Sequence, residues 1–317
     1  MKALVTGGAG FIGSHLAEAL CRRGMRVVVL DNLSSGSLRN LDWHRGDDGL
    51  EFVEGDIRDE KLLTKVVSGC DWVFHQAALP SVPYSVAMPL ESNAHNLEGT
   101  LKLLVAARDG GVKRFLFASS SAIYGDDDAV LKHEGLPPNP LSPYALQKYG
   151  GEKYTQLFHR LYGMETVALR YFNIFGPRQA FTSPYSGVIA KFCTGMLQGN
   201  APVIFGDGSQ SRDFTYIGDA VAANLLAAEA PSKSMAGKVF NIATGQSITL
   251  LQLVSELNRL TGQQLQPRFE PPRPGDVRSS RADISVACRG LGYDPKTTWE
   301  QGLAATLEHY RKNPAIR

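Results

Sequence analysis

The sequence predicts an α/β protein in which a doubly wound parallel sheet is followed by a smaller, interleaved C-terminal α/β domain. Three observations predict this fold class. Short apolar segments alternate with helical stretches through the first half of the chain, and a glycine-rich turn follows the first of them. From Phe175 onward the loops are longer and rich in Pro, Gly and Ser. Such alternation is typical of a parallel sheet with helices on both faces.

The first half begins with a predicted buried strand at 2–6, and a helix starts near Phe11. Further elements are expected as strands at 26–30, 51–54, 72–75, 114–118 and 166–171, and as helices at 90–110 and 142–162. In doubly wound sheets, ligands bind at the carboxyl ends of the strands. We therefore expect functional residues directly after these segments.

The second half is expected to form a smaller unit with its own helices. These are predicted near 187–197, 219–229, 250–261 and 298–311. We place the first domain at 1–174 and the second at 175–317. Segments 214–228 and 239–242 are expected to return to the first domain, so the two are interleaved.

Composition and charge exclude several classes of function. The chain has 317 residues and a net charge of +2, which is too balanced to suggest a nucleic-acid or membrane-surface partner. No apolar run reaches the roughly 18 residues of a membrane span. Because a strand is predicted to start at Lys2, we expect no signal peptide. The four cysteines are far apart and lack metal-ligand spacing, so we expect no metal site and the reduced thiols of a cytoplasmic protein.

The glycine-rich turn has the spacing of a dinucleotide-binding loop. Gly8, Gly10 and Gly13 follow the first strand and open a helix, so backbone N–H groups can face a pyrophosphate. The second strand ends in Asp31, whose carboxylate can accept hydrogen bonds from a ribose 2′-hydroxyl and would repel a 2′-phosphate. The sequence therefore predicts NAD as the cofactor, in preference to NADP.

A tyrosine and a lysine share one helical face in Tyr144-Ala-Leu-Gln-Lys148. A tyrosine titrates near 10 in water, and a neighbouring positive charge favours the phenolate. The pair alone is a weak signal. Together with the hydroxyl cluster Ser119-Ser-Ser121 and the dinucleotide loop, it indicates an acid–base site.

Two arginines stand out in the second half, Arg212 and Arg273, each next to a glycine-containing loop. Arginine binds phosphate oxygens through two parallel hydrogen bonds. The residues alone favour two roles of these arginines about equally, namely binding a diphosphate of the substrate and lying solvated at the surface.

These motifs together resemble the extended short-chain dehydrogenase/reductases, and more closely their nucleotide-sugar epimerase branch around the UDP-glucose and UDP-N-acetylglucosamine 4-epimerases. The resemblance runs from Lys2 to about Pro295 in family order. It rests on Thr6-Gly-Gly-Ala-Gly-Phe-Ile-Gly13, Asp56-Ile57, His75-Gln-Ala-Ala78, Ser119-Ser-Ser-Ala-Ile-Tyr-Gly125, Tyr144-x-x-x-Lys148, Arg170-Tyr-Phe-Asn173, Gly206-Asp-Gly208, Arg212-Asp213 and Arg273-Pro-Gly-Asp276.

The resemblance implies a Rossmann domain that binds NAD and a second domain that binds a UDP-sugar. The implied cofactor residues are Gly7, Gly10, Phe11, Ile12, Gly13, Asp31, Asn32, Asp56, Ile57, Gln76, Ala77, Ala78, Asn96, Tyr144 and Lys148. The implied substrate residues are Ser81, Val82, Ser120, Ser121, Tyr144, Asn173, Val188, Ile189, Phe192, Arg212, Arg273, Asp276 and Ser280. Among these, Val188, Ile189 and Phe192 are expected over the uracil.

The implied reaction is 4-epimerisation of UDP-glucose/UDP-galactose and of UDP-GlcNAc/UDP-GalNAc through a 4-keto sugar. Tyr144 is the expected base, Ser120 the hydroxyl that relays its proton, and Lys148 the group that holds the nicotinamide ribose and lowers the tyrosine pKa. Ser280 is expected at the wall that faces the sugar C2 substituent. Its small side chain leaves room for an acetamido group.

The resemblance includes three alternative functions, namely a sugar 4,6-dehydratase, a uronate epimerase or decarboxylase, and a non-catalytic nucleotide sensor. Sugar 4,6-dehydratases carry an acidic pair where this chain has Ser121 and Ala122, which lack the required acid. Uronate epimerases and decarboxylases need a cation for the sugar carboxylate, and the loop 179–186 offers none. A non-catalytic nucleotide sensor would not need Ser120, Tyr144 and Lys148.

A homodimer is the expected assembly, because the resemblance implies that the helices 90–110 and 142–162 pair with their copies. Both helices carry apolar residues beyond one core stripe, namely Leu97, Leu101, Leu104, Tyr149, Tyr154 and Phe158.

Overall fold

The computed structural model describes residues 1–46, 49–127, 129, 131–180, 187–272 and 278–313. Its main feature is a seven-stranded sheet in the order β11-β6-β5-β4-β1-β2-β3, in which every pair of neighbours is parallel. The strands are β1 (Lys2–Thr6), β2 (Arg26–Asp31), β3 (Leu50–Glu54), β4 (Trp72–His75), β5 (Arg114–Ser120), β6 (Glu165–Tyr171) and β11 (Lys238–Ile242). The predicted doubly wound sheet is therefore confirmed.

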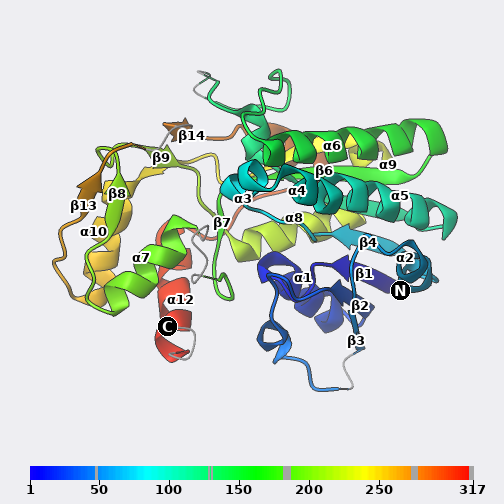
Figure 1. Ribbon diagram of the computed structural model, residues 1–317, viewed down its shortest axis with the longest axis horizontal. Helices are drawn as coiled ribbons and strands as arrows, with labels where there is room; N and C mark the ends of the chain where they lie inside the picture. Colours follow the sequence, from blue (N-terminus) through cyan, green and yellow to red (C-terminus); the bar gives the residue numbers. More distant parts are fainter. Residues whose placement is uncertain (47–48, 128, 130, 181–186, 273–277, 314–317) are drawn as a thin grey trace.

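Helices cover both faces of this sheet (Figure 1). One face packs against α2 (Glu60–Val67), α5 (Gly99–Asp109) and α6 (Pro143–Tyr162), with Leu63, Leu103 and Phe158 in the core. The other face packs against α1 (Phe11–Arg22), α8 (Ile217–Glu229) and α11 (Ser285–Leu291). Because β1, β2 and β5 are buried on both sides, they are nearly continuous apolar runs in the sequence.

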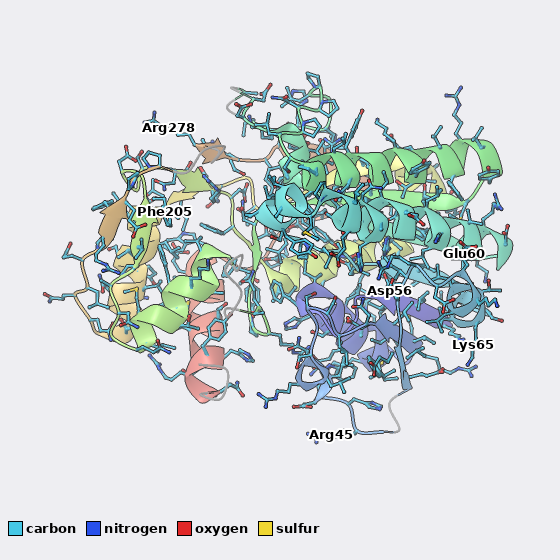
Figure 2. The ribbon with its side chains drawn as sticks, in the orientation of Figure 1. Arg45, Asp56, Glu60, Lys65, Phe205 and Arg278 are labelled. Atoms are coloured by element: carbon cyan, nitrogen blue, oxygen red, sulfur yellow. The ribbon has the colours of Figure 1, made fainter. Side chains whose placement is uncertain are left out.

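The smaller unit lies beside the carboxyl edge of the sheet and has a separate core (Figure 1). Its helices are α7 (Val188–Leu197), α10 (Leu250–Thr261) and α12 (Trp299–Lys312). Short strands complete it: β7 (Ile174–Phe175) with β10 (Thr215–Tyr216), β8 (Val203–Phe205) with β13 (Arg268–Glu270), and β9 (Ser211–Arg212) between β12 (Ile248–Thr249) and β14 (Ser279–Ser280). In Figure 2, Phe205 and Arg278 mark this unit, and Asp56 lies on the side of the large sheet.

The helix predicted at 90–110 is interrupted. The chain forms α3 (Val82–Ala87), α4 (Pro89–Asn93), a π-helical segment η2 (Ala94–Glu98) and then α5. A π turn holds an extra residue and is frequent at functional sites. The spacing of apolar residues does not reveal the π-helical segment, because α4 before it and α5 after it run in the same direction. Among the described residues, the short helices α3, η1 (Leu38–Leu41), η3 (Ser121–Tyr124), α9 (Ser232–Met235) and α11 were absent from the sequence-based expectation.

Helix α6 carries the Tyr144–Lys148 pair, and local chemistry fixes where it begins and ends. The Ser142 hydroxyl accepts a hydrogen bond from the N–H of Ala145 at 3.2 Å, and Pro143 occupies the first turn. Gly163 ends the helix in the left-handed conformation at φ 70°. The helix start thereby sets which turn faces the cavity at the ends of the strands.

Candidate active site

A cavity of about 1160 Å³ lies at the carboxyl ends of the strands and extends to the smaller unit. Its lining brings together most of the residues expected to bind the cofactor: Gly7, Gly10, Phe11, Ile12, Gly13, Asp31, Asn32, Ile57, Gln76, Ala77, Ala78, Tyr144 and Lys148. It also includes Ser81, Ser120, Ser121, Asn173, Arg212 and Ser280 from the expected substrate residues. Residues far apart in the sequence therefore share one site.

The glycine loop fits a dinucleotide because no side chain could be added to it. A Cβ atom on Gly13 would lie 2.2 Å from the Gly7 carbonyl oxygen, and one on Gly7 would lie 2.7 Å from the backbone nitrogen of Ala77. No side chain caps the N-terminus of α1, which opens into the cavity. An open helix N-terminus presents N–H groups and a partial positive charge to a phosphate.

Asp31 is held rigidly at the end of β2. Its carboxylate accepts hydrogen bonds from the N–H of Ala9 at 3.0 Å and of Leu33 at 2.8 Å. Burial raises the pKa of Asp31, and these backbone hydrogen bonds act in the opposite direction. The carboxylate is thus fixed beside the glycine loop, where a ribose hydroxyl of a dinucleotide can reach it.

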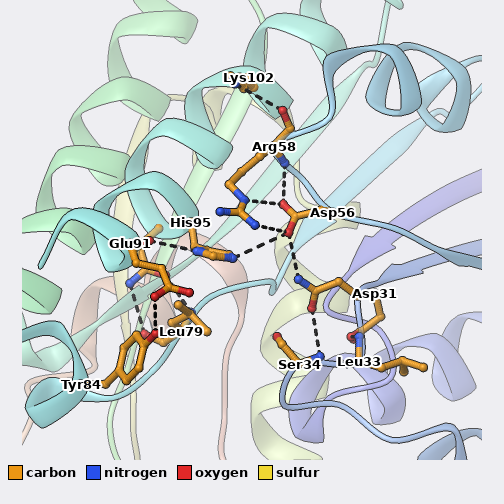
Figure 3. Close-up of polar contacts among 12 residues, drawn as sticks. Asp31, Leu33, Ser34, Asp56, Arg58, Leu79, Tyr84, Glu91, His95 and Lys102 are labelled. Carbon is orange, nitrogen blue, oxygen red and sulfur yellow. Dashed lines mark hydrogen bonds and ion pairs between the residues drawn. The ribbon is translucent and has the colours of Figure 1, made fainter. Parts of the chain in front are cut away.

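Asp56 differs from its expected place, because Gly55 and Ile57 line the cavity while its own carboxylate turns to protein partners. Figure 3 shows this carboxylate between Arg58 and His95. It accepts hydrogen bonds from Arg58 Nη2 at 2.8 Å and from Asn32 Nδ2 at 3.0 Å, and His95 Nε2 lies 3.7 Å away. The Arg58 guanidinium holds the pKa of Asp56 well below its usual range.

Asn96, the other expected cofactor residue outside the lining, lies in the π-helical segment and is buried. Its side chain accepts a hydrogen bond from the N–H of Leu79 at 2.7 Å and donates one to Gln147 Oε1 at 2.9 Å. It therefore orders the loop after β4, whose backbone lines the cavity.

Tyr144, Ser120 and Lys148 all line the cavity. The Ser120 hydroxyl lies close enough to the Tyr144 phenol to favour the ionised form of the phenol. The Lys148 ammonium donates to the carbonyl oxygen of Ala118 at 2.9 Å, one turn of α6 away from Tyr144. The Tyr144 N–H donates to the Ser85 hydroxyl at 3.1 Å, which ties the start of α6 to α3.

The electrostatics of this group differ from the expectation that Lys148 lowers the pKa of Tyr144. Burial raises the pKa of the Tyr144 phenol, and the hydrogen bond with Ser120 offsets only part of this rise. Burial also lowers the pKa of Lys148 to about 7, which weakens its charge at neutral pH. Buried His75, hydrogen-bonded to Thr6 Oγ1 at 2.7 Å, has a pKa lowered to about 3 by burial and by Lys148.

On the substrate side, Arg212 and Ser280 are direct neighbours in register on β9 and β14. The buried carboxylate of Asp213 joins three segments behind them, because it accepts from Thr244 Oγ1 at 2.7 Å, the Gly245 N–H at 3.0 Å and the Ala282 N–H at 3.2 Å. Asn173, in a left-handed conformation at φ 39°, donates to the Asp213 carbonyl oxygen at 3.0 Å. The sequence did not reveal Asp213 as the residue that holds this wall.

Several expected substrate residues lie elsewhere. Ile189 and Phe192 are buried in the core of the smaller unit, and Val188 packs against that core, so this face of α7 supports the wall without lining the cavity. Val82 is exposed and also lies outside the lining. Arg273 and Asp276 lie outside the described residues.

The cavity also contains residues that the sequence reasoning missed, namely Tyr124, Lys132, Tyr171, Arg178, Gln179, His309 and Tyr310. Arg178 has a left-handed backbone at φ 66° and ion-pairs with Glu18 of α1. Its position directly after Gly176-Pro177, at the start of the second half, was the one signal that could have drawn attention to it.

The described residues contain no group of three or more His, Cys, Asp or Glu side chains arranged to hold a metal ion. Within the same part of the chain, none of the helices has the length and apolar character needed to cross a membrane.

The fold and the cavity define a dinucleotide-dependent enzyme of the doubly wound α/β class. The chain belongs to the NAD dependent epimerase/dehydratase family, whose model matches residues 3–243. NAD is therefore its cofactor, as the glycine loop and Asp31 predicted.

Three solved structures of similar proteins carry the comparison further. A UDP-glucose 4-epimerase from Thermotoga maritima, solved with UDP-glucose, is 42% identical at a TM-score of 0.93, covering 99% of this chain and 100% of that one. A UDP-N-acetylglucosamine 4-epimerase from Methanobrevibacter ruminantium, in complex with UDP-N-acetylmuramic acid, is 40% identical at 0.93, covering 98% of each chain. A Thermus thermophilus UDP-glucose 4-epimerase complexed with NAD is 36% identical at 0.87, covering 98% and 99%.

The family is broader than these three proteins. Similar sequences also include a UDP-glucuronate 4-epimerase from Thermodesulfobacterium geofontis, 32% identical over 98% of this chain and 96% of its own length. A UDP-N-acetyl-α-D-glucosaminuronate decarboxylase from Bacillus cytotoxicus is 33% identical over 98% of both. Membership of the family therefore leaves the sugar and the reaction to be argued from the site.

Proposed function

We propose that the protein is a UDP-hexose 4-epimerase that accepts UDP-glucose/UDP-galactose and UDP-GlcNAc/UDP-GalNAc. The observation that carries the proposal is the Ser120 hydroxyl beside the Tyr144 phenol, with Lys148 one helical turn away and no carboxylate at Ser121 or Ala122. Such a site can move one proton at a sugar hydroxyl but lacks the acid that a dehydratase needs. The neighbouring Arg212 and Asn173 suit a diphosphate.

In the proposed reaction, Tyr144 accepts the proton of the sugar 4-hydroxyl through Ser120 and returns it after the 4-keto sugar has turned over. The chemistry supplied by bound NAD is reversible hydride acceptance at sugar C4, and its charged nicotinamide ring favours the phenolate that burial disfavours. Lys148 donates from the next turn of α6 and is placed to hold ribose hydroxyls. Because the proton and the hydride both return, the reaction has no net redox change.

Incubating the purified protein with UDP-galactose, UDP-GlcNAc and UDP-glucuronate, with separation of the products, tests the proposal. We expect the 4-epimers of the first two substrates. A protein that binds NAD but converts no nucleotide sugar would be a sensor, and a decarboxylated product would place it in another branch of the family.

UDP-glucuronate 4-epimerisation is a second candidate because of Lys132. This buried lysine lines the cavity, and its main chain bonds to residues 281–283 next to Ser280. Its ammonium is paired with Asp127. The expectation that the site lacks a cation considered only the loop 179–186, so it missed this residue. Conversion of UDP-glucuronate alone would favour this candidate.

The size of Ser280 predicts which sugars are accepted. Replacing Ser280 with Tyr is expected to suppress conversion of the N-acetyl sugars and largely spare that of UDP-glucose, because a ring cannot share space with an acetamido group. Overpacking costs about 1–3 kcal/mol, which is roughly a five- to two-hundredfold loss in kcat/KM. The ratio of kcat/KM values for UDP-GlcNAc and UDP-glucose measures this.

The control for this substitution is Ser209→Tyr, which adds the same ring on an exposed loop outside the cavity lining. An equal change of both activities in Ser280→Tyr would show that Ser280 does not face the C2 substituent.

We also propose that the protein forms a homodimer through α4, α5 and α6. The expected residues Leu104 and Phe158 are buried in the sheet core, so they are not available to a partner. Other leucines are available to a partner, since Leu90 is 87% exposed and Leu161 is 64% exposed. One face of α6 carries three exposed leucines, Leu146, Leu157 and Leu161. The first two are three helical turns apart, and the last two are one turn apart.

An exposed apolar stripe of this kind is typical of a protein interface. Light scattering at micromolar concentration is expected to give twice the chain mass of 34.4 kDa. Substitution of Leu161 with Glu should shift the mass toward the monomer, and a wild-type mass of 34.4 kDa would contradict the proposal.

A further inference from the structure

Glu152 is a fully buried carboxylate one turn beyond Lys148 on α6, and the proposed chemistry does not use it. Lys148 and Glu152 are four residues apart, so their side chains leave the helix on the same face. Both point toward the carboxyl end of β5. A buried charge at this depth needs compensation from specific partners.

The two side chains bind two consecutive residues of β5. Lys148 Nζ donates to the Ala118 carbonyl oxygen at 2.9 Å, and the Ser119 hydroxyl donates to Glu152 Oε2 at 3.0 Å. Ser120 is the next residue along the strand. The helix that carries Tyr144 is thus hydrogen-bonded to the strand that carries Ser120, at the two residues that precede Ser120.

Arg170 prevents the carboxylate from turning away from Ser119. It lies on β6 directly opposite Ser119 in the sheet register. Its Nε donates to Glu152 Oε2 at 2.8 Å and its Nη2 to Oε1 at 2.6 Å, with both side chains almost entirely buried. Two parallel hydrogen bonds fix the plane of a carboxylate. Arg170 also lies over the ring of Tyr124, 4.8 Å from its centroid.

We propose that Glu152 is a positioning residue that sets the distance between the Ser120 hydroxyl and the Tyr144–Lys148 pair. This inference rests on the catalytic roles proposed above. Stability alone does not explain the arrangement, because well-packed apolar residues commonly replace a buried ion pair without loss of stability. The geometry of the reaction explains the arrangement, because the rate falls steeply when the groups that exchange a proton are displaced by about 1 Å.

Two substitutions separate the parts of this arrangement. Ser119→Ala removes the hydroxyl and leaves the Glu152–Arg170 pair intact. In Glu152→Gln, the new NH2 group replaces an oxygen that accepts from Arg170, whichever way the amide is oriented. We expect each variant to lower kcat about ten- to a hundredfold, with KM and bound NAD nearly unchanged. In the double variant, kcat should fall no further than in the worse single variant.

Thr166→Val is the matched control. The Thr166 hydroxyl donates to the carbonyl oxygen of Thr155 at 2.6 Å, so it also joins α6 to the sheet, but far from the cavity. We expect a similar loss of melting temperature and an unchanged kcat. A fall in kcat equal to that of Ser119→Ala would mean that Glu152 supports the fold only.

Hydrogen exchange of segment 115–123 tests the inference independently of turnover. Exchange should accelerate in Ser119→Ala and Glu152→Gln, and stay at the wild-type rate in Thr166→Val. If no nucleotide sugar is converted by the wild type, the proposed function is wrong. If exchange is unchanged in both variants, the positioning role is wrong whatever the activity. Additive effects on kcat would also overturn it.

Discussion

Tyr144→Phe is expected to lower kcat by about three orders of magnitude, because the substitution keeps the ring and removes the proton acceptor. The phenylalanine ring can occupy the same place at the start of α6, so the hydrogen bond from the Tyr144 main chain to Ser85 is retained. Bound NAD is expected to remain, since the glycine loop and Asp31 are untouched. Steady-state kinetics with UDP-galactose and the absorbance ratio at 260 and 280 nm measure the two effects.

The pH profile of the wild type is a second readout of the same group. Burial raises the pKa of Tyr144, so the phenolate, which is the proposed base, becomes more populated as the pH increases toward that pKa, and kcat should rise with pH. The residual activity of Tyr144→Phe should lack this rise. A variant with full activity would remove Tyr144 from the reaction.

Gly13→Ala is expected to abolish NAD retention. A Cβ atom at this position would lie 2.2 Å from the Gly7 carbonyl oxygen and 2.8 Å from Gly8 Cα, and these are backbone atoms that cannot turn aside. Either α1 moves away from the loop or the loop opens, and both would displace the N–H groups proposed to face the phosphates of NAD. An overpacking cost of about 3 kcal/mol corresponds to about a hundredfold weaker binding. Isothermal titration with NAD measures it.

Gly195→Ala is the control for this substitution. Gly195 lies within α7, and a Cβ atom there would have nothing within 4 Å. We expect it to keep NAD affinity and to raise the free energy of unfolding by about 0.5–1 kcal/mol, because alanine favours a helix more than glycine does. If Gly13→Ala bound NAD as tightly as Gly195→Ala, the tight turn would not be needed for the cofactor.

The sheet and the central residues could be predicted because their signals are local. Strand, turn and helix follow one another around Gly13, and Tyr144 and Lys148 are related by one helical turn, so spacing alone places them. The six strands of the first half needed no long-range information, whereas residues 239–242 were expected only as a segment that returns to the first domain.

What could not be predicted depends on contacts between distant segments. The apolar period of α7 indicates that Ile189 and Phe192 share one face, but not that this face packs on α10 and α12. The pairing of Lys132 with residues 281–283 joins segments about 150 residues apart, and no spacing rule anticipates it. The pKa of Tyr144 was expected to fall because Lys148 lies one helical turn away, whereas burial, which is a property of the whole fold, raises it.

The position of β11 at the edge of the large sheet determines when the protein can fold during its synthesis. This strand is formed by residues 238–242, so about three-quarters of the chain has left the ribosome before β6 acquires its neighbour. Until then, β6 is an apolar edge strand with unpaired N–H and C=O groups, which can pair with other nascent chains. Expression of residues 1–174 alone should therefore yield aggregates, and the cofactor-binding half should become protease-resistant only when the chain extends beyond Ile242.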